Sequence, residues 1–444
     1  MSDLGVRPPF DDQLPPIQAI ERAVQERAKD LHLDMGLPGG RKLLRDLIDD
    51  EIEAWADEVR RGRRTQALAN VELVADRVWR NLAEHGPLTA LLADPDVWEV
   101  EVNGPDQVFV KRHHGPSGYH HESFHDDDHV VRTLTKLLDE SSASHRKLDP
   151  TEGLQDAQLD DGSRLHIVHA DVARGGHVMV NIRRFTGVPY TQLEELVERD
   201  TLDHTAARFL AAAVRAGASI VVAGAPGSGK TTLLSCCIGE LDPSLRVVIA
   251  EEVFEVDAPL ANVAQMQTRP ARQDRPEIDL RRLVSGFLRM APDVAIVGEV
   301  RDREALPLLL TLSSGVTGFT TIHAGSARQA LSRLRFLAHL GEGSPQLPHG
   351  ALTSLVSEAV DLVVFSQRGP DGPKVTEVLA VEDLAGQGEG AAFTTTALFL
   401  RPSHGQALEW TGNVPVRLGE RLVANGDDCV ELLGGHGPTP GRPR

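Results

Sequence analysis

The sequence predicts a protein of the α/β class with a parallel sheet in its C-terminal half. After residue 206, apolar segments that have the length of buried strands alternate with helical segments. This alternation is typical of a parallel sheet covered by helices. A second observation is that one strand segment runs directly into a glycine-rich turn and then a helix. Residues before 186 follow other patterns and predict further domains.

Composition limits the possible classes of protein. The chain has 444 residues, of which 41% are hydrophobic and 25% charged, as in a soluble globular protein of about two to four domains. A net charge of −19 argues against general affinity for nucleic acid or anionic lipid. Three cysteines without a CxxC pair exclude a disulfide framework. Because neither a signal peptide nor an apolar run of about 18 residues is visible, we expect a cytoplasmic location.

Residues 1–85 are expected to form a helical N-terminal region. Ile48, Ile52, Trp55 and Val59 recur at helical spacing, and a second helical repeat follows after residue 70. Four arginines and one glycine occupy the stretch between the two helices. We interpret this stretch as a solvated turn, with a basic contact to a partner as the alternative.

Residues 86–186 predict a small α+β domain. The segment Val97–Asn103 alternates apolar and polar residues, as a half-buried strand does. Further strands are expected at 108–111, 165–168 and 178–185, and a helix at 131–138. Six histidines fall between residues 113 and 129. Their spacing matches no metal-ligand motif, so we expect a hairpin loop there rather than a metal site.

The remaining chain is divided by glycine and proline. We expect a linker at 187–205, an α/β domain at 206–385 and a C-terminal extension at 386–444 whose Gly/Pro-rich end is disordered. Buried strands of the α/β domain are expected at Ile220–Ala223, Val247–Ala250, Val294–Val297 and Thr320–Ile322.

The glycine-rich turn matches the phosphate-binding motif G-x-x-x-x-G-K-[ST] in full. Its residues are Gly224, Ala225, Pro226, Gly227, Ser228, Gly229, Lys230 and Thr231, and Thr232 continues the helix. The glycines let backbone N–H groups converge on phosphates, and the helix N-terminus adds its positive dipole end. The motif predicts that Lys230 reaches the β- and γ-phosphates of a nucleotide and that the Thr231 hydroxyl ligates Mg²⁺.

Carboxylates and one histidine follow the other strands. Glu299 ends an apolar strand and would hold Mg²⁺, most simply through a water. Glu251, Glu252 and Glu255 follow another strand, where a carboxylate can orient or deprotonate the attacking water of phosphoryl transfer. His323 lies among small apolar residues, and its spacing by itself does not distinguish a structural from a functional role.

These elements, in this order, resemble the type II/type IV secretion ATPase superfamily, the hexameric motors of secretion systems and type IV pili. The likeness is greatest to its tight-adherence branch (Tad, CpaF-type), which assembles pili, and it covers about residues 85–385. It is carried by the segments Leu92–Gly104, Asp160–Arg164, Asn181–Phe185, Gln267–Pro270, Leu288–Asp293, Gly298–Arg301 and Thr321–Ala324.

The resemblance implies a bilobed subunit, with a small α+β (PAS-like) domain that closes over a RecA-like P-loop domain and the nucleotide between them. It implies that Glu251 is the leading catalytic carboxylate, that Glu299 ends the Walker B strand and that His323 couples to the γ-phosphate. Arg164 and Arg183 would neutralise charge on the phosphates, a role that suits the permanently charged guanidinium.

The resemblance also implies an ATP-hydrolysing homohexamer that drives pilus assembly or secretion. It would act at the cytoplasmic face of the inner membrane through a platform protein, with indirect membrane contact and no specific nucleic acid. Two positions depart from the family pattern. Glu252 replaces the usual aspartate after the first acid, and Val316 stands where a histidine usually follows Thr-Gly, so no function is carried over to either.

Four alternatives stay open. A type IV secretion or conjugation ATPase shares the same motifs. A RecA-like DNA-handling protein would need affinity for single strands, against which the charge argues. A regulator that binds ATP without turnover is disfavoured by intact Lys230, Glu251 and Glu299. A small-molecule phosphotransferase would need an acceptor pocket, for which the sequence has no sign.

Overall fold

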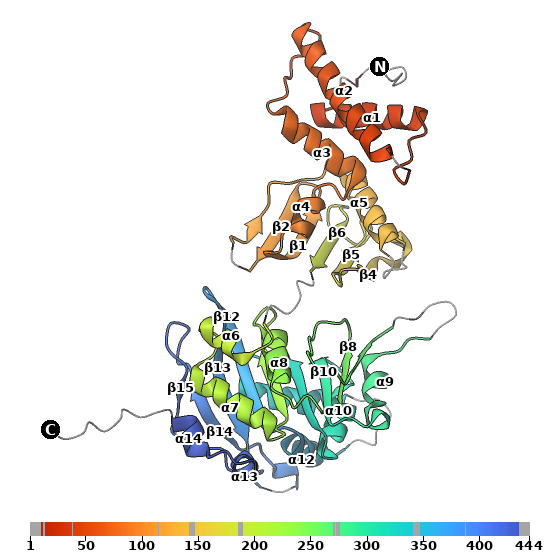
Figure 1. Cartoon of the computed structure of the whole chain (residues 1–444). Coiled ribbons are helices and arrows are strands. Elements are labelled where there is room, and N and C mark those ends of the chain that lie inside the picture. Colours follow the sequence, from red (N-terminus) through yellow and green to blue (C-terminus); the bar gives the residue numbers. More distant parts are fainter. Residues whose placement is uncertain are drawn as a thin grey trace, which may run out of the picture. The chain divides into compact units, whose positions relative to one another are not determined.

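The computed structural model describes residues 10–11, 14–37, 39–113, 115–141, 147–184, 190–269, 271, 276–340, 347–386 and 388–434 (Figure 1). The chain forms two compact units, Met1–Thr186 and Gly187–Arg444. Each unit has its own hydrophobic core, and they are described in turn. None of the helices in these ranges is both long and apolar enough to cross a membrane.

The N-terminal unit begins with three helices, α1 (Pro16–Asp30), α2 (Gly40–Arg60) and α3 (Val71–Ala83). Each has one apolar face, and these faces pack into a common core around the fully buried Ile48 and Trp55. The expected helical segment is therefore confirmed.

The arginine-rich stretch follows α2. Arg60 and Arg61 form ion pairs with Asp57, and Arg64 pairs with Glu58. The Arg64 guanidinium also lies 4.3 Å from the centroid of the Trp55 ring, so it covers this buried aromatic side chain. Most of the positive charge of the stretch is thus neutralised within the unit.

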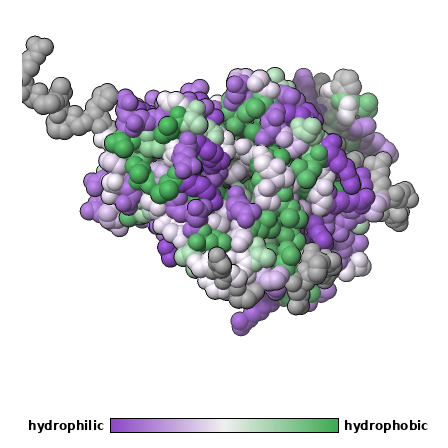
Figure 2. All heavy atoms as spheres, turned by 90° about the horizontal axis from the view of Figure 1, so that it is seen from below, coloured by the Kyte–Doolittle hydropathy of each residue, from purple (hydrophilic) through white to green (hydrophobic). Residues whose placement is uncertain are grey.

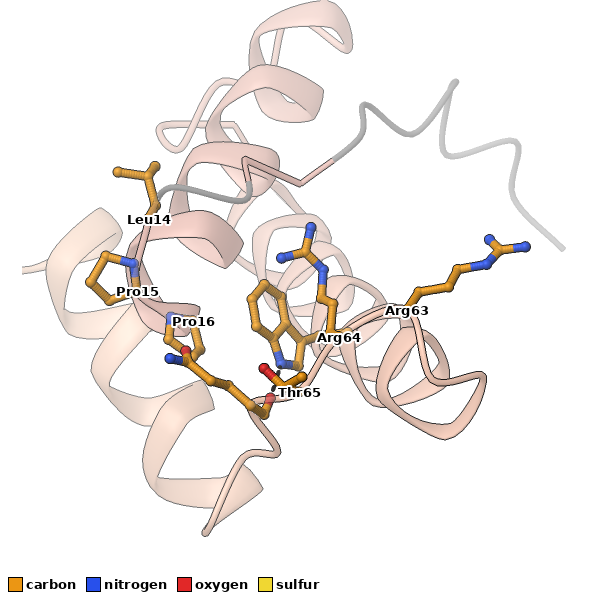
Figure 3. Close-up of a pocket in the computed structure, with 8 residues that line it drawn as sticks. Leu14, Pro15, Pro16, Arg63, Arg64 and Thr65 are labelled. Atoms are coloured by element: carbon orange, nitrogen blue, oxygen red, sulfur yellow. Dashed lines mark hydrogen bonds between the residues drawn. The ribbon is translucent and has the colours of Figure 1, made fainter.

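A pocket of about 490 Å³ opens beside Arg64. It is lined by Leu14, Pro15, Pro16, Trp55, Arg63, Arg64, Thr65 and Gln66. Figure 3 shows the residues before and at the start of α1 on one side of the pocket and the two arginines on the other.

The rest of the N-terminal unit is the predicted α+β domain. Its six-stranded antiparallel sheet has the order β3-β2-β1-β6-β5-β4. The strands are β1 (Val97–Gly104), β2 (Gln107–Arg112), β3 (Gly118–Tyr119), β4 (Leu154–Gln158), β5 (Arg164–Val168) and β6 (Met179–Arg183). Apolar residues of α4 (Leu88–Ala93) and α5 (Asp127–Glu140) pack on one face of the sheet. The short 3₁₀ helix η1 (Pro150–Glu152) precedes β4.

The C-terminal unit is built on a nine-stranded sheet of order β15-β14-β13-β12-β7-β11-β10-β8-β9. The six strands from β12 to β9 are parallel, and β13, β14 and β15 extend the sheet antiparallel to their neighbours. The strands are β7 (Ile220–Gly224), β8 (Val247–Glu251), β9 (Val263–Gln267), β10 (Val294–Val300), β11 (Thr317–Ile322), β12 (Leu362–Gly369), β13 (Gly372–Val381), β14 (Thr395–Leu400) and β15 (Glu409–Trp410).

Helices cover both faces of this sheet (Figure 1). Side chains alternate along a strand, so Ile220 and Val222 of β7 enter one core while Val221 and Ala223 enter the other. The first core contains residues of α6 (Leu193–Glu198), α7 (His204–Arg215) and α8 (Lys230–Gly239). The second contains residues of α9 (Leu280–Val284), η2 (Phe287–Met290), α10 (Ala305–Ser313), α11 (Ala327–His339) and α12 (His349–Ala359). The predicted α/β class and all four predicted strands are confirmed.

At both ends of this unit the structure differs from the domain boundaries that we predicted from the sequence. Within the expected linker, 187–205, the structure has α6, whose Leu193 and Leu196 are buried in the first core. Within the expected extension, 386–444, β14 and β15 add to the sheet, and α13 (Arg417–Ala424) and α14 (Cys429–Gly434) contribute leucines to the same core. The glycines and prolines in these segments mark turns, not domain boundaries. Strands on either side of such a turn pair with each other through non-local contacts. The end that we expect to be disordered is 434–444; Gly434 is the last residue of α14, and the rest lies outside the described residues.

Candidate functional site

The glycine-rich turn has the strand–turn–helix context that phosphate binding requires. β7 ends at Gly224 and α8 begins at Lys230. Gly227 and Gly229 have φ angles of +72° and +82°, which residues with a Cβ atom rarely adopt. These glycines let the chain reverse at the end of the strand and enter the helix within five residues.

The turn fits a phosphate group. The first N–H groups of an α-helix have no acceptor within the helix, and here they belong to α8. The Lys230 amino group lies over the turn, 3.0 Å from the carbonyl oxygen of Ala225. The Ser228 hydroxyl is buried, and it forms no hydrogen bond with any of the residues that the structure describes. Thr231 and Thr232 occupy the first turn of α8, where the predicted metal ligand Thr231 is expected.

The sheet brings the predicted residues together. β7, β11, β10 and β8 are consecutive neighbours and run parallel, so their carboxyl ends form one edge. Along this edge lie the glycine-rich turn, His323 after β11, Glu299 near the end of β10 and Glu251 at the end of β8. Ligands of open α/β sheets bind at the carboxyl ends of the strands.

A chain of polar contacts connects three of these side chains. The Lys230 Nζ lies 3.3 Å from His323 Nδ1, and His323 Nε2 lies 2.6 Å from Glu299 Oε1. A lysine ammonium only donates and a carboxylate only accepts. In a neutral imidazole, a hydrogen on Nε2 would face Glu299 and would leave Nδ1 as the acceptor for Lys230. The same Nδ1 lies 3.3 Å from the carbonyl oxygen of Gly224.

Arg301 fixes the ionised state of Glu299. Its guanidinium donates to Glu299 Oε2 at 2.7 Å and to Glu252 Oε2 at 2.8 Å. Burial by itself would raise the pKa of Glu299, but the contacts with His323 and Arg301 outweigh it and lower the pKa to about 2. The bond to Glu299 in turn raises the pKa of Arg301. Glu299 is therefore a permanent anion at neutral pH, as a metal-binding carboxylate must be.

We expect Glu299→Gln to reduce the acid sensitivity of folding. A carboxyl whose pKa is lowered from 4.5 to about 2 stabilises the folded state above its ordinary pKa and loses this contribution as the pH falls toward 2. The difference in free energy of unfolding between wild type and variant should therefore shrink between about pH 5 and pH 2. Denaturant titrations followed by circular dichroism measure it. Glu420→Gln, at an exposed position of α13, should show no such trend, and a pH-independent difference for Glu299→Gln would contradict the assignment.

Glu251 is held more deeply than the other acids. Its side chain is 2% exposed, and its Oε1 accepts backbone N–H groups of Glu255 and Val256, each at 2.9 Å. A Cβ atom on Gly298 would lie 2.9 Å from Glu251 Cγ, so the glycine in β10 makes room for this side chain. By contrast, Glu252 is 45% exposed and its carboxylate contacts Arg301. The first acid of the pair, and not the second, is therefore the one buried among the strand ends.

The two predicted arginines lie in the other unit. Arg164 begins β5 and Arg183 ends β6, and they are directly opposite each other in the antiparallel pair. Both are partly exposed. In the ranges that the structure describes, Arg183 forms no ion pair with an acidic side chain. The pair thus places two guanidinium groups at one position of the N-terminal sheet.

Three contributions were not predicted from the sequence. Arg301 was noted only as part of a motif, and its bridge between Glu299 and Glu252 depends on two separate strands. Ser366 and Arg368 of β12 donate hydrogen bonds to carbonyl oxygens of the glycine-rich turn. The one available signal was a serine directly after the apolar run Leu362–Phe365.

Two further groups of potential ligands are the histidine-rich stretch and the adjacent cysteines. Among the described residues, no group of three or more His, Cys, Asp or Glu side chains is arranged to hold a metal ion, and His114 of the histidine-rich stretch lies outside them. Cys236 and Cys237 are buried in α8, where burial raises the pKa of both thiols, that of Cys237 to about 12. Neither thiol is therefore poised to react.

The parallel sheet, the P-loop at its edge and the carboxylates beside it define a RecA-like P-loop nucleotide-binding unit. The chain belongs to the type II/IV secretion system protein family, whose model matches residues 81–368.

Two relatives and one solved structure are among the proteins to which this chain is similar. The type IV secretion system protein PtlH of Bordetella pertussis is 31% identical over 304 residues, which cover 62% of this chain and 87% of that protein. The putative conjugal transfer protein Rv3659c of Mycobacterium tuberculosis is 31% identical over 326 residues, 71% of this chain and 88% of the relative. The crystal structure of the VirB11 ATPase of Brucella suis is 26% identical and covers 66% of this chain and 94% of its own, with a TM-score of 0.36.

Proposed function

We propose that the protein hydrolyses ATP. The observation that carries this proposal is the contact series Lys230–His323–Glu299 beside the buried Glu251, at the end of the P-loop strand. These are the groups that phosphoryl transfer to water needs: a cation and N–H groups for the phosphates, a carboxylate for a metal and another for the water. Because Lys230, Glu299 and Glu251 are all present, a regulator that binds ATP without hydrolysing it is disfavoured.

Each residue has a distinct role in the proposed reaction. Lys230 and the first N–H groups of α8 bind the phosphates, and Thr231 and Glu299 would hold Mg²⁺. The metal would neutralise phosphate charge when bound. Glu251 accepts a proton from a water whose oxygen bonds to the γ-phosphorus, while the bond to the β-phosphate oxygen breaks and ADP leaves. His323 touches both Lys230 and Glu299, so it links the phosphate site to the metal site.

The arginines of the N-terminal unit supply the remaining charge in this proposal. Arg164 and Arg183 would neutralise the γ-phosphate when the N-terminal unit closes over the nucleotide. Their cross-strand pairing supports the assignment because it brings two permanent cations to one place.

We further propose that six copies form a ring that powers pilus assembly of the tight-adherence type from the inner face of the cell membrane. A protein platform, rather than lipid or nucleic acid, would receive the force. Figure 2 shows patches of hydrophobic residues between hydrophilic ones on the face seen from below. Large exposed apolar side chains of the C-terminal unit include Leu288, Leu310, Phe336, Val416, Val423 and Val430. Such patches are typical of protein interfaces.

A second candidate function is transport by a type IV secretion or conjugation system. Relatives named for these systems favour it, because each matches over most of its own length. Neighbouring genes separate the two candidates. Pilin and platform genes would support pilus assembly, whereas conjugation-channel genes would support the second candidate.

The particle mass in solution tests the ring. With magnesium and a non-hydrolysable ATP analogue, we expect a species of six times the 48.1-kDa chain mass. Light scattering after size-exclusion chromatography measures it directly. A monomer or dimer at high protein concentration would contradict a ring that assembles by itself, and would leave nucleotide hydrolysis to be tested by turnover.

A further inference from the structure

The hairpin formed by β12 and β13 lies beside the P-loop. β12 pairs in parallel with β7, and Ser366 is opposite Gly224, where the loop begins. A Cβ atom on Gly224 would lie 2.3 Å from the carbonyl oxygen of Ser366 and 2.4 Å from Oγ of Ser228. A Cβ atom on Gly229 would likewise lie 3.0 Å from Pro373. The hairpin therefore approaches the loop as closely as glycine permits.

Two side chains of β12 hydrogen-bond to the loop backbone. The Ser366 hydroxyl donates to the carbonyl oxygen of Ser228 at 2.6 Å, and the Arg368 guanidinium donates to that of Gly227 at 3.2 Å. Ser366 is 2% exposed and Ser228 fully buried, so no water competes for the first bond. Ser366 Oγ also lies 3.2 Å from the carbonyl oxygen of Lys374. A hydroxyl has one hydrogen, and the shorter contact takes it.

The direction of these bonds determines where the loop's N–H groups point. In a trans peptide, the C=O and the N–H lie on opposite sides of the chain, and no cis peptide occurs among the residues described. A Ser228 carbonyl turned toward β12 therefore turns the N–H of Gly229 away from β12. The backbone N–H groups of such a loop are its phosphate ligands. Bonds from β12 thus orient the peptide planes that bind phosphate.

We propose that Ser366, assisted by Arg368, is a positioning residue that holds the P-loop in its nucleotide-binding conformation. The proposal rests on the proposed function, because it assigns Ser366 a role in the same phosphate site. Neither side chain needs to touch the nucleotide. Both act through carbonyl oxygens on the outer side of the loop.

The test compares Ser366→Ala with Ser357→Ala. Ser357 is a matched control, because it is 3% exposed and its hydroxyl donates to a carbonyl oxygen, that of Glu382, at 3.1 Å. Both variants lose one buried hydroxyl, so their melting temperatures without nucleotide should fall alike. Only Ser366→Ala should weaken Mg-ADP binding, by about tenfold for one buried hydrogen bond. Its KM for ATP should rise more than its kcat falls.

Each outcome decides between roles. An unchanged Kd for Mg-ADP in Ser366→Ala would overturn the positioning role, as would an equal loss in both serine variants. Should Ser366→Ala fail to fold, the exposed Arg368→Met carries the test, with weaker Mg-ADP binding expected and an unchanged Kd overturning the proposal. Wild type that binds no Mg-ADP would overturn the proposed function as well, which separates the two failures.

Discussion

Replacing Lys230 by alanine should reduce ATP turnover by about 10²–10³-fold, the usual effect of losing one preorganised group that stabilises transition-state charge. The lysine is 7% exposed, and its amino group lies within 3.3 Å of both the P-loop carbonyl of Ala225 and His323. Lys230 is the first residue of α8, the helix that follows the loop. Steady-state phosphate release at saturating magnesium and ATP measures the loss.

The control for this variant is Lys42→Ala, which removes an exposed lysine from α2. It should leave turnover at the wild-type level, which shows that loss of one lysine charge from this acidic protein is not by itself harmful. Circular dichroism should show that Lys230→Ala keeps its fold. Normal turnover in Lys230→Ala would refute the assignment of the P-loop as the catalytic phosphate site.

Glu251→Gln should separate nucleotide binding from hydrolysis. The amide keeps an oxygen that can accept the N–H groups of Glu255 and Val256, so the loop geometry is preserved. It cannot take a proton from water, and general-base catalysis contributes about 10²–10⁴-fold to such reactions. We therefore expect kcat to fall by about that factor while Mg-ADP affinity stays near the wild-type value. Turnover assays and fluorescence titration together measure both quantities.

Glu252→Gln is the matched control for this variant. The two acids are adjacent in sequence, but Glu252 is 45% exposed and bound to Arg301, whereas Glu251 is 2% exposed. We expect turnover close to the wild-type level for Glu252→Gln. The reverse result, with activity lost at Glu252 and kept at Glu251, would move the catalytic carboxylate to the second position.

Local sequence signals were sufficient for much of the fold and of the site. Each buried strand of the α/β unit is a contiguous apolar run, and the P-loop is a contiguous motif whose strand and helix adjoin it. The carboxylates and His323 could be located because they directly follow such strands. Parallel strands place their carboxyl ends on one edge, so the meeting of these residues follows from the fold class.

The predicted domain boundaries at 187–205 and 386–444 were less accurate, because they were inferred from the positions of glycine and proline residues. Gly386 and its neighbours predict a break, yet β14 returns to pair with β13, and leucines of α13 and α14 fill the core. α6 is only six residues long, too short for a reliable helical period, and its burial depends on α7 and α8. Pairing and packing across a turn are non-local, so local composition carries no signal for them.

From the sequence by itself we could predict the fold class, the glycine-rich loop, and the acids and the histidine beside it. Each of these features is a short contiguous segment whose residue types indicate its structure or chemistry. The tertiary structure decided which acid is buried, which side chains His323 contacts and which groups hold the loop. Glu251 rather than Glu252 lies under Gly298, Arg301 bridges two strands, and Ser366 contacts a loop 138 residues earlier in the chain. These are contacts between distant segments, whose geometry exists only after the sheet has formed.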